Sequence, residues 1–144
     1  MNPATAAHEF DEILRKRALR TVFHPIVCLD SGDTVGYECL VRPPADSRFA
    51  SADVLLGEAY RTGRVVDFDW AARASASRAA LDHELRPDRL LFLNIEPLAM
   101  GSECPPDLWP VGVITGALGR GTSTRQQRPT PGSASAWPST SPPF

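Results

Sequence analysis

Apolar residues near the N-terminus recur with the period of an amphipathic helix. Phe10, Ile13 and Leu14 follow the i, i+3, i+4 spacing that places side chains on one helix face. The segment ends in a run of basic residues, which favour the negative end of the helix dipole. The pattern therefore predicts a helix over residues 8–20, and we interpret residues 1–20 as a lead-in helix that precedes the main domain.

A β-hairpin is predicted directly after this helix. Residues 21–28 and 34–42 are rich in β-branched and aromatic side chains, as strands usually are. Between them lie residues 30–33, with the sequence DSGD, whose residue types favour tight turns. We expect the two segments to pair in antiparallel.

The middle of the chain alternates between helical and strand patterns. Ser51 precedes a short helical pattern that Gly63 ends, and Asp67 precedes a longer one that runs to about residue 85. The longer helix has a face of small residues that can pack closely on a sheet. Residues 90–95 (LLFLNI) are apolar on both faces, which is typical of a parallel strand covered on both sides. Strand, helices and strand in this order predict an α/β fold.

The C-terminal part of the chain has a different composition. Residues 112–144 are dominated by Gly, Pro, Ser and Thr, contain no Asp or Glu, and show no sustained apolar period. We expect this tail to be disordered, because such a segment cannot bury enough apolar surface to fold. Its abrupt start also suggests the hypothesis that the tail is out-of-frame translation of a GC-rich gene.

Length and charge limit the classes of function. With 144 residues, 42% hydrophobic residues and a net charge of -2, the chain has room for one domain and lacks the positive charge typical of nucleic-acid binding. Its apolar runs are shorter than the roughly 20 residues of a membrane helix, and the N-terminus lacks the order of a signal peptide. We therefore expect a cytoplasmic protein with neither a nucleic acid polymer nor a membrane as partner.

The cysteines do not form a recognisable framework. Cys28, Cys39 and Cys104 are odd in number and have no CxxC spacing, which fits neither a disulfide pattern nor a zinc site. We expect them to be reduced thiols in the core or in loops.

Polar side chains that can carry chemistry lie on the second and third predicted strands. Because strand side chains alternate, Glu38, Leu40 and Arg42 share one face. The strand from Glu38 to Arg42 spans roughly 13 Å, so a bound phosphodiester, rather than a direct salt bridge, would connect them. Asn94 lies at the carboxyl end of the third strand, where barrel enzymes hold their chemistry, and its amide oxygen suits Mg²⁺ or Mn²⁺. The plainer alternative is that such residues face solvent or cap turns.

Other polar residues have plainer explanations. We interpret His24 as a strand residue without catalytic work. Asp67 and Asp69 are expected to be a helix cap and a partner of the helix dipole, and Glu58 a solvated helix residue.

Four segments resemble, in the correct order, successive signatures of the EAL domain: FHPIV, LDSGDTVGYECLVRP, GEAYRTGRVVDFDW and LLFLNI. Glu38-Cys39-Leu40 stands at the place of the family's Glu-Ala-Leu motif, with cysteine in place of alanine. Arg42 stands at the place of the following arginine, and Asn94 at that of the family's metal-binding asparagine.

The resemblance covers residues 21–111 and implies a fold and an activity. The implied fold is an incomplete TIM-type (β/α) barrel whose first strand runs antiparallel to the rest. EAL domains are bacterial phosphodiesterases that open cyclic di-GMP to linear pGpG with two divalent ions. By this resemblance Glu38 and Asn94 would ligate Mg²⁺ or Mn²⁺. Arg42 and Leu40 would contact the substrate, cyclic di-GMP.

The chain departs from the family pattern after Asn94. The later glutamates, the paired aspartates and the lysine of an active EAL site do not appear, and no acidic residue follows Asp107. We therefore expect a truncated domain without a complete catalytic set, which does not hydrolyse cyclic di-GMP alone. Two alternatives stay open: a degenerate cyclic di-GMP-binding or protein-interaction module, whose open sheet edge is covered by a partner protein or a second copy, and a nonfunctional gene remnant.

Overall fold

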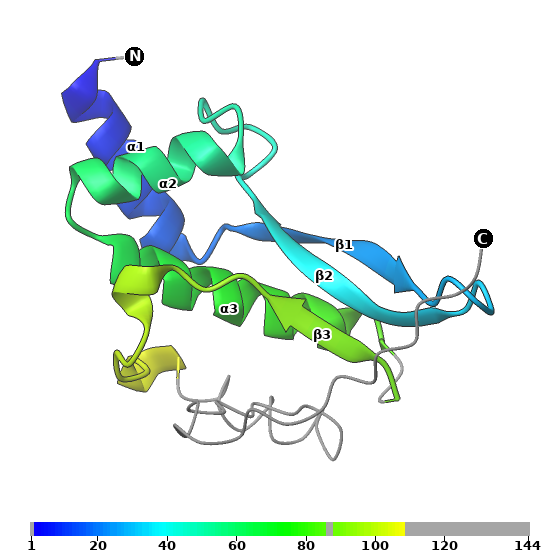
Figure 1. Ribbon diagram of the computed structural model, residues 1–144. Coiled ribbons are helices and arrows are strands. Elements are labelled where there is room, and N and C mark those ends of the chain that lie inside the picture. Colours follow the sequence, from blue (N-terminus) through cyan, green and yellow to red (C-terminus); the bar gives the residue numbers. More distant parts are fainter. Residues whose placement is uncertain (1, 86–87, 109–144) are drawn as a thin grey trace, which may run out of the picture.

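The computed structural model describes residues 2–85 and 88–108 of the chain. Figure 1 shows a small sheet with helices packed at one end of it and along it. In chain order the elements are α1 (Pro3–Lys16), β1 (Arg20–Val27), β2 (Thr34–Arg42), α2 (Ala52–Arg61), α3 (Val65–Asp82), β3 (Leu90–Leu93) and two 3-10 turns, η1 (Pro97–Ala99) and η2 (Pro106–Leu108). The predicted tail, residues 112–144, lies outside the described residues.

The sheet confirms the predicted hairpin and the predicted parallel strand. Its order is β1-β2-β3, with β1 antiparallel to β2 and β2 parallel to β3. In this register Glu38 lies between His24 on β1 and Phe92 on β3. The described residues thus form an α/β fold with a three-stranded sheet, and a closed barrel is not part of it.

The third strand is shorter than predicted, because β3 ends at Leu93 and not at residue 95. The backbone N–H of Glu96 donates to the side chain of Asp69 (2.9 Å), not to a neighbouring strand. Pro97 follows and has no N–H to donate. The pairing with β2 ends at Leu93, and by Glu96 the backbone has turned towards α3.

α1 begins and ends earlier than the apolar pattern predicted. Asn2 is its N-cap and accepts a hydrogen bond from the Ala4 N–H (3.0 Å), with Pro3 at the first helical position. At the other end Arg17 takes the left-handed conformation (φ 53°), which stops the helix. Basic residues do occupy the last turn, as expected.

The caps of the other two helices were predicted with mixed success. Ser51 is the N-cap of α2, and its hydroxyl accepts from the Val54 N–H (3.4 Å), which confirms the prediction. The prediction for α3 was wrong, because the helix begins at Val65 and no side chain caps it. Asp67 lies inside the first turn and pairs with Arg64 at 2.9 Å.

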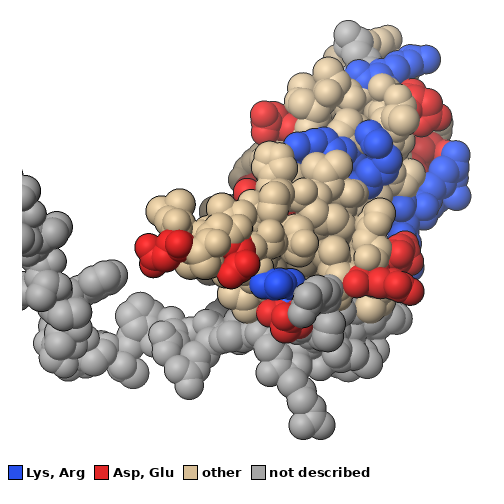
Figure 2. Space-filling view, turned by 90° about the vertical axis from the view of Figure 1, so that its right-hand side faces the viewer, with Lys and Arg blue, Asp and Glu red and all other residues tan. Residues whose placement is uncertain are grey.

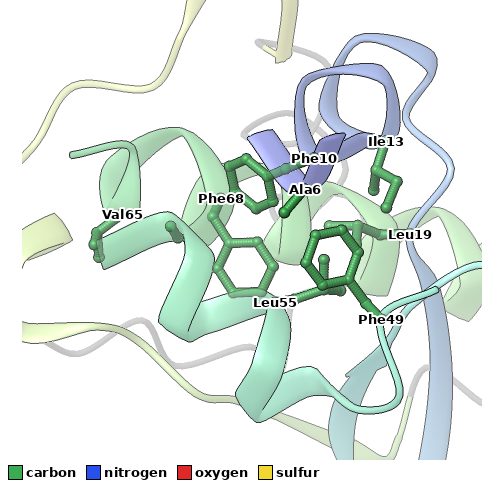
Figure 3. Close-up of a cluster of buried hydrophobic side chains, with 9 residues drawn as sticks. Ala6, Phe10, Ile13, Leu19, Phe49, Leu55, Val65 and Phe68 are labelled. Atoms are coloured by element: carbon green, nitrogen blue, oxygen red, sulfur yellow. The ribbon is translucent and has the colours of Figure 1, made fainter. Parts of the chain in front are cut away.

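A hydrophobic cluster joins the three helices, as Figure 3 shows. Phe10 of α1 and Leu55 of α2 are fully buried at its centre. The Phe10 ring packs against Phe49 and against Phe68 of α3, with ring centroids 6.4 and 6.2 Å apart. Glu58 borders this region and is buried, so its predicted solvation was wrong; it forms an ion pair with Arg61 at 2.5 Å.

α3 covers one face of the sheet. The Thr21 hydroxyl on β1 lies 2.9 Å from that of Ser75, and the Phe23 ring packs edge-on against His83 just after the helix. The opposite face carries exposed apolar side chains, among them Leu90 (43% exposed) and Phe92 (45% exposed). β3, predicted to be covered on both sides, is therefore covered on one side by the described residues.

The charged surface is mixed in sign. Figure 2 shows basic and acidic side chains lying close to one another on the face that it draws. Among the described residues, no helix has the length and apolar character needed to cross a membrane.

Candidate functional site

The structure brings Glu38 and Asn94 into contact. Glu38 lies in the middle of β2, and Asn94 follows β3 directly. The Asn94 Nδ2 atom donates a hydrogen bond to Glu38 Oε1 at 3.1 Å. The parallel register of β2 and β3 produces this contact, since Phe92 is the partner of Glu38 and Asn94 lies two positions further on. Two residues that are 56 apart in sequence thus share one site.

Arg42 lies at the carboxyl end of the same strand face. Its Nη1 donates to the backbone oxygen of Val41 at 2.9 Å, and Leu40 lies between it and Glu38 along the strand. The guanidinium does not pair with Glu38, in agreement with the predicted separation. The site therefore has an amide and a carboxylate in contact, with a cation further along β2.

A cavity of about 330 Å³ opens where β2 and β3 end, beneath α2 and beside α3. Leu40, Arg42 and Asn94 contribute to its walls, together with residues of α3 such as Asp69 and Arg73, whereas Glu38 does not. Its size lies at the lower end of the range for small-molecule sites. A separate hollow of about 410 Å³ between α1 and residues 44–48 contains none of the predicted site residues.

The described side chains do not form a complete metal centre. Mg²⁺ requires about six oxygen ligands in octahedral geometry, usually including several waters. Across residues 2–85 and 88–108, no group of three or more His, Cys, Asp or Glu side chains could hold a metal ion. Glu38 and Asn94 offer one carboxylate and one amide, which is part of a site. The predicted Mg²⁺ or Mn²⁺ ligation by these two residues stays a prediction.

Sequence reasoning assigned little importance to two residues that border the site. His24 lies opposite Glu38 on β1, so the two side chains project from the same face. Asp69 was expected to act on the helix dipole, yet it is 3% exposed, pairs with Arg73 and accepts the Glu96 N–H. The spacing Asp-x-x-x-Arg on the small-residue face of α3 was the signal that could have identified this pair.

Two pKa shifts describe the surroundings of the site. Burial under α3 raises the pKa of Cys39 to about 11, and the neighbouring Glu38 charge adds to this rise. The hydroxyl of Tyr60 on α2 donates to the Glu96 carboxylate (2.8 Å), which raises the pKa of Tyr60. Both shifts favour the neutral form of the group.

The chain is similar in structure to the crystal structure of the FimX EAL domain, with a TM-score of 0.55 and 21% sequence identity. The similarity covers 78% of this chain and 46% of that one, so the chain spans less than half the length of that structure. At this identity the similarity shows an EAL-like fold alone. No protein-family model and no curated protein matches the chain.

Proposed function

We propose that this chain is a partial EAL-type module of cyclic di-GMP signalling that binds the nucleotide without hydrolysing it alone. The observation that carries the proposal is the hydrogen bond from Asn94 to Glu38 near the carboxyl end of the parallel β2–β3 ladder in an EAL-like fold. Polar groups at the carboxyl ends of parallel strands are the usual chemical face of barrel enzymes. The four quoted sequence signatures supply the nucleotide class.

Each residue of the site has a distinct task in this proposal. Arg42 donates to a phosphate of cyclic di-GMP, for which the planar fork of a guanidinium is well suited. Leu40 packs against the bound nucleotide beside it. Glu38 and Asn94 supply polar atoms at the far side, and by the family resemblance they contribute to metal binding.

Hydrolysis by the chain alone is not part of the proposal. In the resembled family two ions supply the nucleophile and neutralise charge in the transition state. One carboxylate and one amide do not fix two ions, and residues 108–144 contain no Asp or Glu. The proposal therefore predicts binding without formation of pGpG.

Calorimetric titration of the full 144-residue chain with cyclic di-GMP, with and without Mg²⁺ or Mn²⁺, tests this function. We expect saturable binding, and chromatography should detect no pGpG. Arg42→Ala should weaken binding by about tenfold or more, because a hydrogen bond to a charged phosphate is lost. Arg78→Ala is the matched control, since Arg78 is an exposed arginine on α3 away from the site. A folded chain that does not bind, or equal affinities of the two variants, would contradict the proposal.

Exposed apolar side chains on β3 favour a second candidate function, that of a protein-interaction module. Leu90 and Phe92 face solvent on the last strand of the sheet, and an exposed apolar strand at a sheet edge is a template for another chain. Light scattering over a range of concentrations tests it: Phe92→Ser should reduce self-association. Val54→Ser on α2 is the control, because Val54 is similarly exposed (47%). Identical mass distributions for wild type and Phe92→Ser would exclude self-association through this face.

A further inference from the structure

The geometry points to Asp69 as a positioning residue that fixes the chain after β3 and thereby holds Asn94 against Glu38. The effect of Asp69 on cyclic di-GMP binding rests on the proposed function. The effect of Asp69 on the position of Asn94 does not.

Asp69 is a buried carboxylate with one oxygen in a hydrogen bond and the other, Oδ2, in an ion pair without hydrogen-bond geometry. It lies in the second turn of α3 and is 3% exposed. Oδ1 accepts a hydrogen bond from the backbone N–H of Glu96 at 2.9 Å. Oδ2 pairs with the guanidinium of Arg73, one helical turn further on, whose side chain is 14% exposed. The Arg73 guanidinium also lies over the Trp70 ring, 4.3 Å from its centroid.

Packing alone does not explain this ion pair. Transfer of two charges from water to a protein interior has a large desolvation cost, and apolar residues of similar size often stabilise a fold equally well. An apolar side chain, however, cannot accept the Glu96 N–H. The Glu96 N–H is partly buried, and leaving such a group without a partner is disfavoured, so the carboxylate favours this position of the backbone after it leaves the sheet.

Further contacts hold the same segment. The Glu96 carboxylate accepts from the Tyr60 hydroxyl at 2.8 Å, and Trp70 Nε1 donates to Ser102 Oγ at 2.9 Å. Asn94 lies two residues before Glu96, so at most about 7 Å of chain separates it from the held amide. Tyr60 of α2 and the first half of α3 thus provide the support on which Asn94 reaches Glu38.

Two double variants separate the hydrogen bond from the charge pair. Asp69→Asn/Arg73→Met removes both charges and keeps an oxygen acceptor for the Glu96 N–H. Asp69→Leu/Arg73→Met also removes both charges, at similar side-chain size, but leaves no acceptor. Asp67→Asn is the control for loss of an acidic residue from α3, because Asp67 pairs with Arg64 at the surface.

The readouts are amide hydrogen exchange at Glu96 and the NMR resonances of the Asn94 side-chain amide. We expect the Glu96 amide to exchange about tenfold or more faster in the leucine variant than in the asparagine variant, with the Asn94 amide resonances shifted in the leucine variant alone. Asp67→Asn should resemble wild type in both. Equal exchange and equal Asn94 resonances in the two double variants would overturn the inference.

If the leucine variant does not fold, amide hydrogen exchange of the wild-type protein tests the inference instead. A Glu96 amide protected to the same degree as the amides of α3 supports the inference, and exchange at the rate of an unstructured amide overturns it. Titration of both double variants with cyclic di-GMP is a separate experiment. In it the affinity of the leucine variant should be about tenfold lower than that of the asparagine variant. Absence of binding by wild type would overturn the proposed function, while the exchange result still decides the role of Asp69.

Discussion

Two aspartates near the start of α3 have the same side chain and different surroundings. Asp67 is exposed and pairs with Arg64 at the surface, where such a pair contributes little to stability. Asp69, two residues later, is buried and accepts a backbone N–H from the segment after β3. The two residues are of the same type and lie two positions apart on one helix. The tertiary contact with the Glu96 N–H therefore determines which aspartate holds the chain beside the site.

The cysteines allow a prediction about single side chains. Hydrogen bonds from Ser31 and Asp30 lower the pKa of Cys28, whereas burial raises that of Cys39 to about 11. The thiolate is the reactive form. In the native protein at pH 8 we expect iodoacetamide to modify Cys28 at least about 100-fold faster than Cys39. Mass spectrometry of a time course measures both rates, and unfolding in urea should make them similar.

Tyr60 gives a prediction about pH. Its hydrogen bond to Glu96 raises its pKa in the folded state, so folding favours the neutral phenol. The stability from this bond is complete below the unfolded pKa of about 10 and is lost as the pH rises through the folded pKa. Wild type should therefore unfold at a higher temperature than Tyr60→Phe at pH 7, and this difference should shrink towards pH 11. A difference that stays constant over this range would contradict the assigned bond.

The sequence predicted which residues form the candidate site better than it predicted the contacts between them. Glu38, Arg42 and Asn94 could be selected from strand alternation and the EAL resemblance. The 3.1 Å contact of Glu38 with Asn94 depends on the register of β2 and β3, which no local signal sets. The role of Asp69 depends on where the chain turns after β3, which local sequence does not set either.

Between elements, β2 and β3 approach too closely at Gly36 to leave room for a side chain. A Cβ atom built at this position would lie 2.7 Å from the backbone oxygen of Leu90 and 3.0 Å from its Cβ. Because the first contact is with backbone, the neighbour cannot move without shifting β3. Gly36 therefore permits the register that brings Asn94 to Glu38.

Gly36→Ala should lower the free energy of unfolding by about 1–3 kcal/mol, the usual range for overpacking. Gly57→Ala is the control, because a Cβ at Gly57 meets nothing within 4 Å. Gly57 lies inside α2, where alanine is favoured, so this change should stabilise the protein by about 0.5–1 kcal/mol. Urea denaturation of both variants measures the two effects. A Gly36→Ala protein as stable as wild type would show that β2 and β3 are not packed as described.

Elements with strong local signals were predicted well, and their ends less well. The hairpin follows from two β-rich segments around DSGD, and α2 from the Ser51 cap. α1 begins at an Asn-Pro signal that the apolar pattern did not include, and α3 begins without any side-chain cap. β3 ends two residues before its predicted end, and the Glu96 N–H that follows donates to Asp69, from a distant part of the sequence.

For the whole molecule, the described fold corresponds to less than half of the EAL domain that it resembles in structure. Three strands with α3 on one face leave the other face of the sheet, with Phe92 and Leu90, exposed among the described residues. In a closed barrel this face would be interior and filled with side chains. The same openness gives a nucleotide access to Glu38 and Arg42, so the proposed site and the proposed interaction face lie on one side of the sheet.

An NMR titration of the full-length, isotope-labelled chain with cyclic di-GMP tests the central claim most directly. The account predicts that the largest shifts occur at Glu38, Leu40, Arg42 and the Asn94 side-chain amide, while resonances of the hollow between α1 and residues 44–48 stay in place. Shifts confined to that hollow, or no shifts at saturating nucleotide in a folded protein, would contradict it.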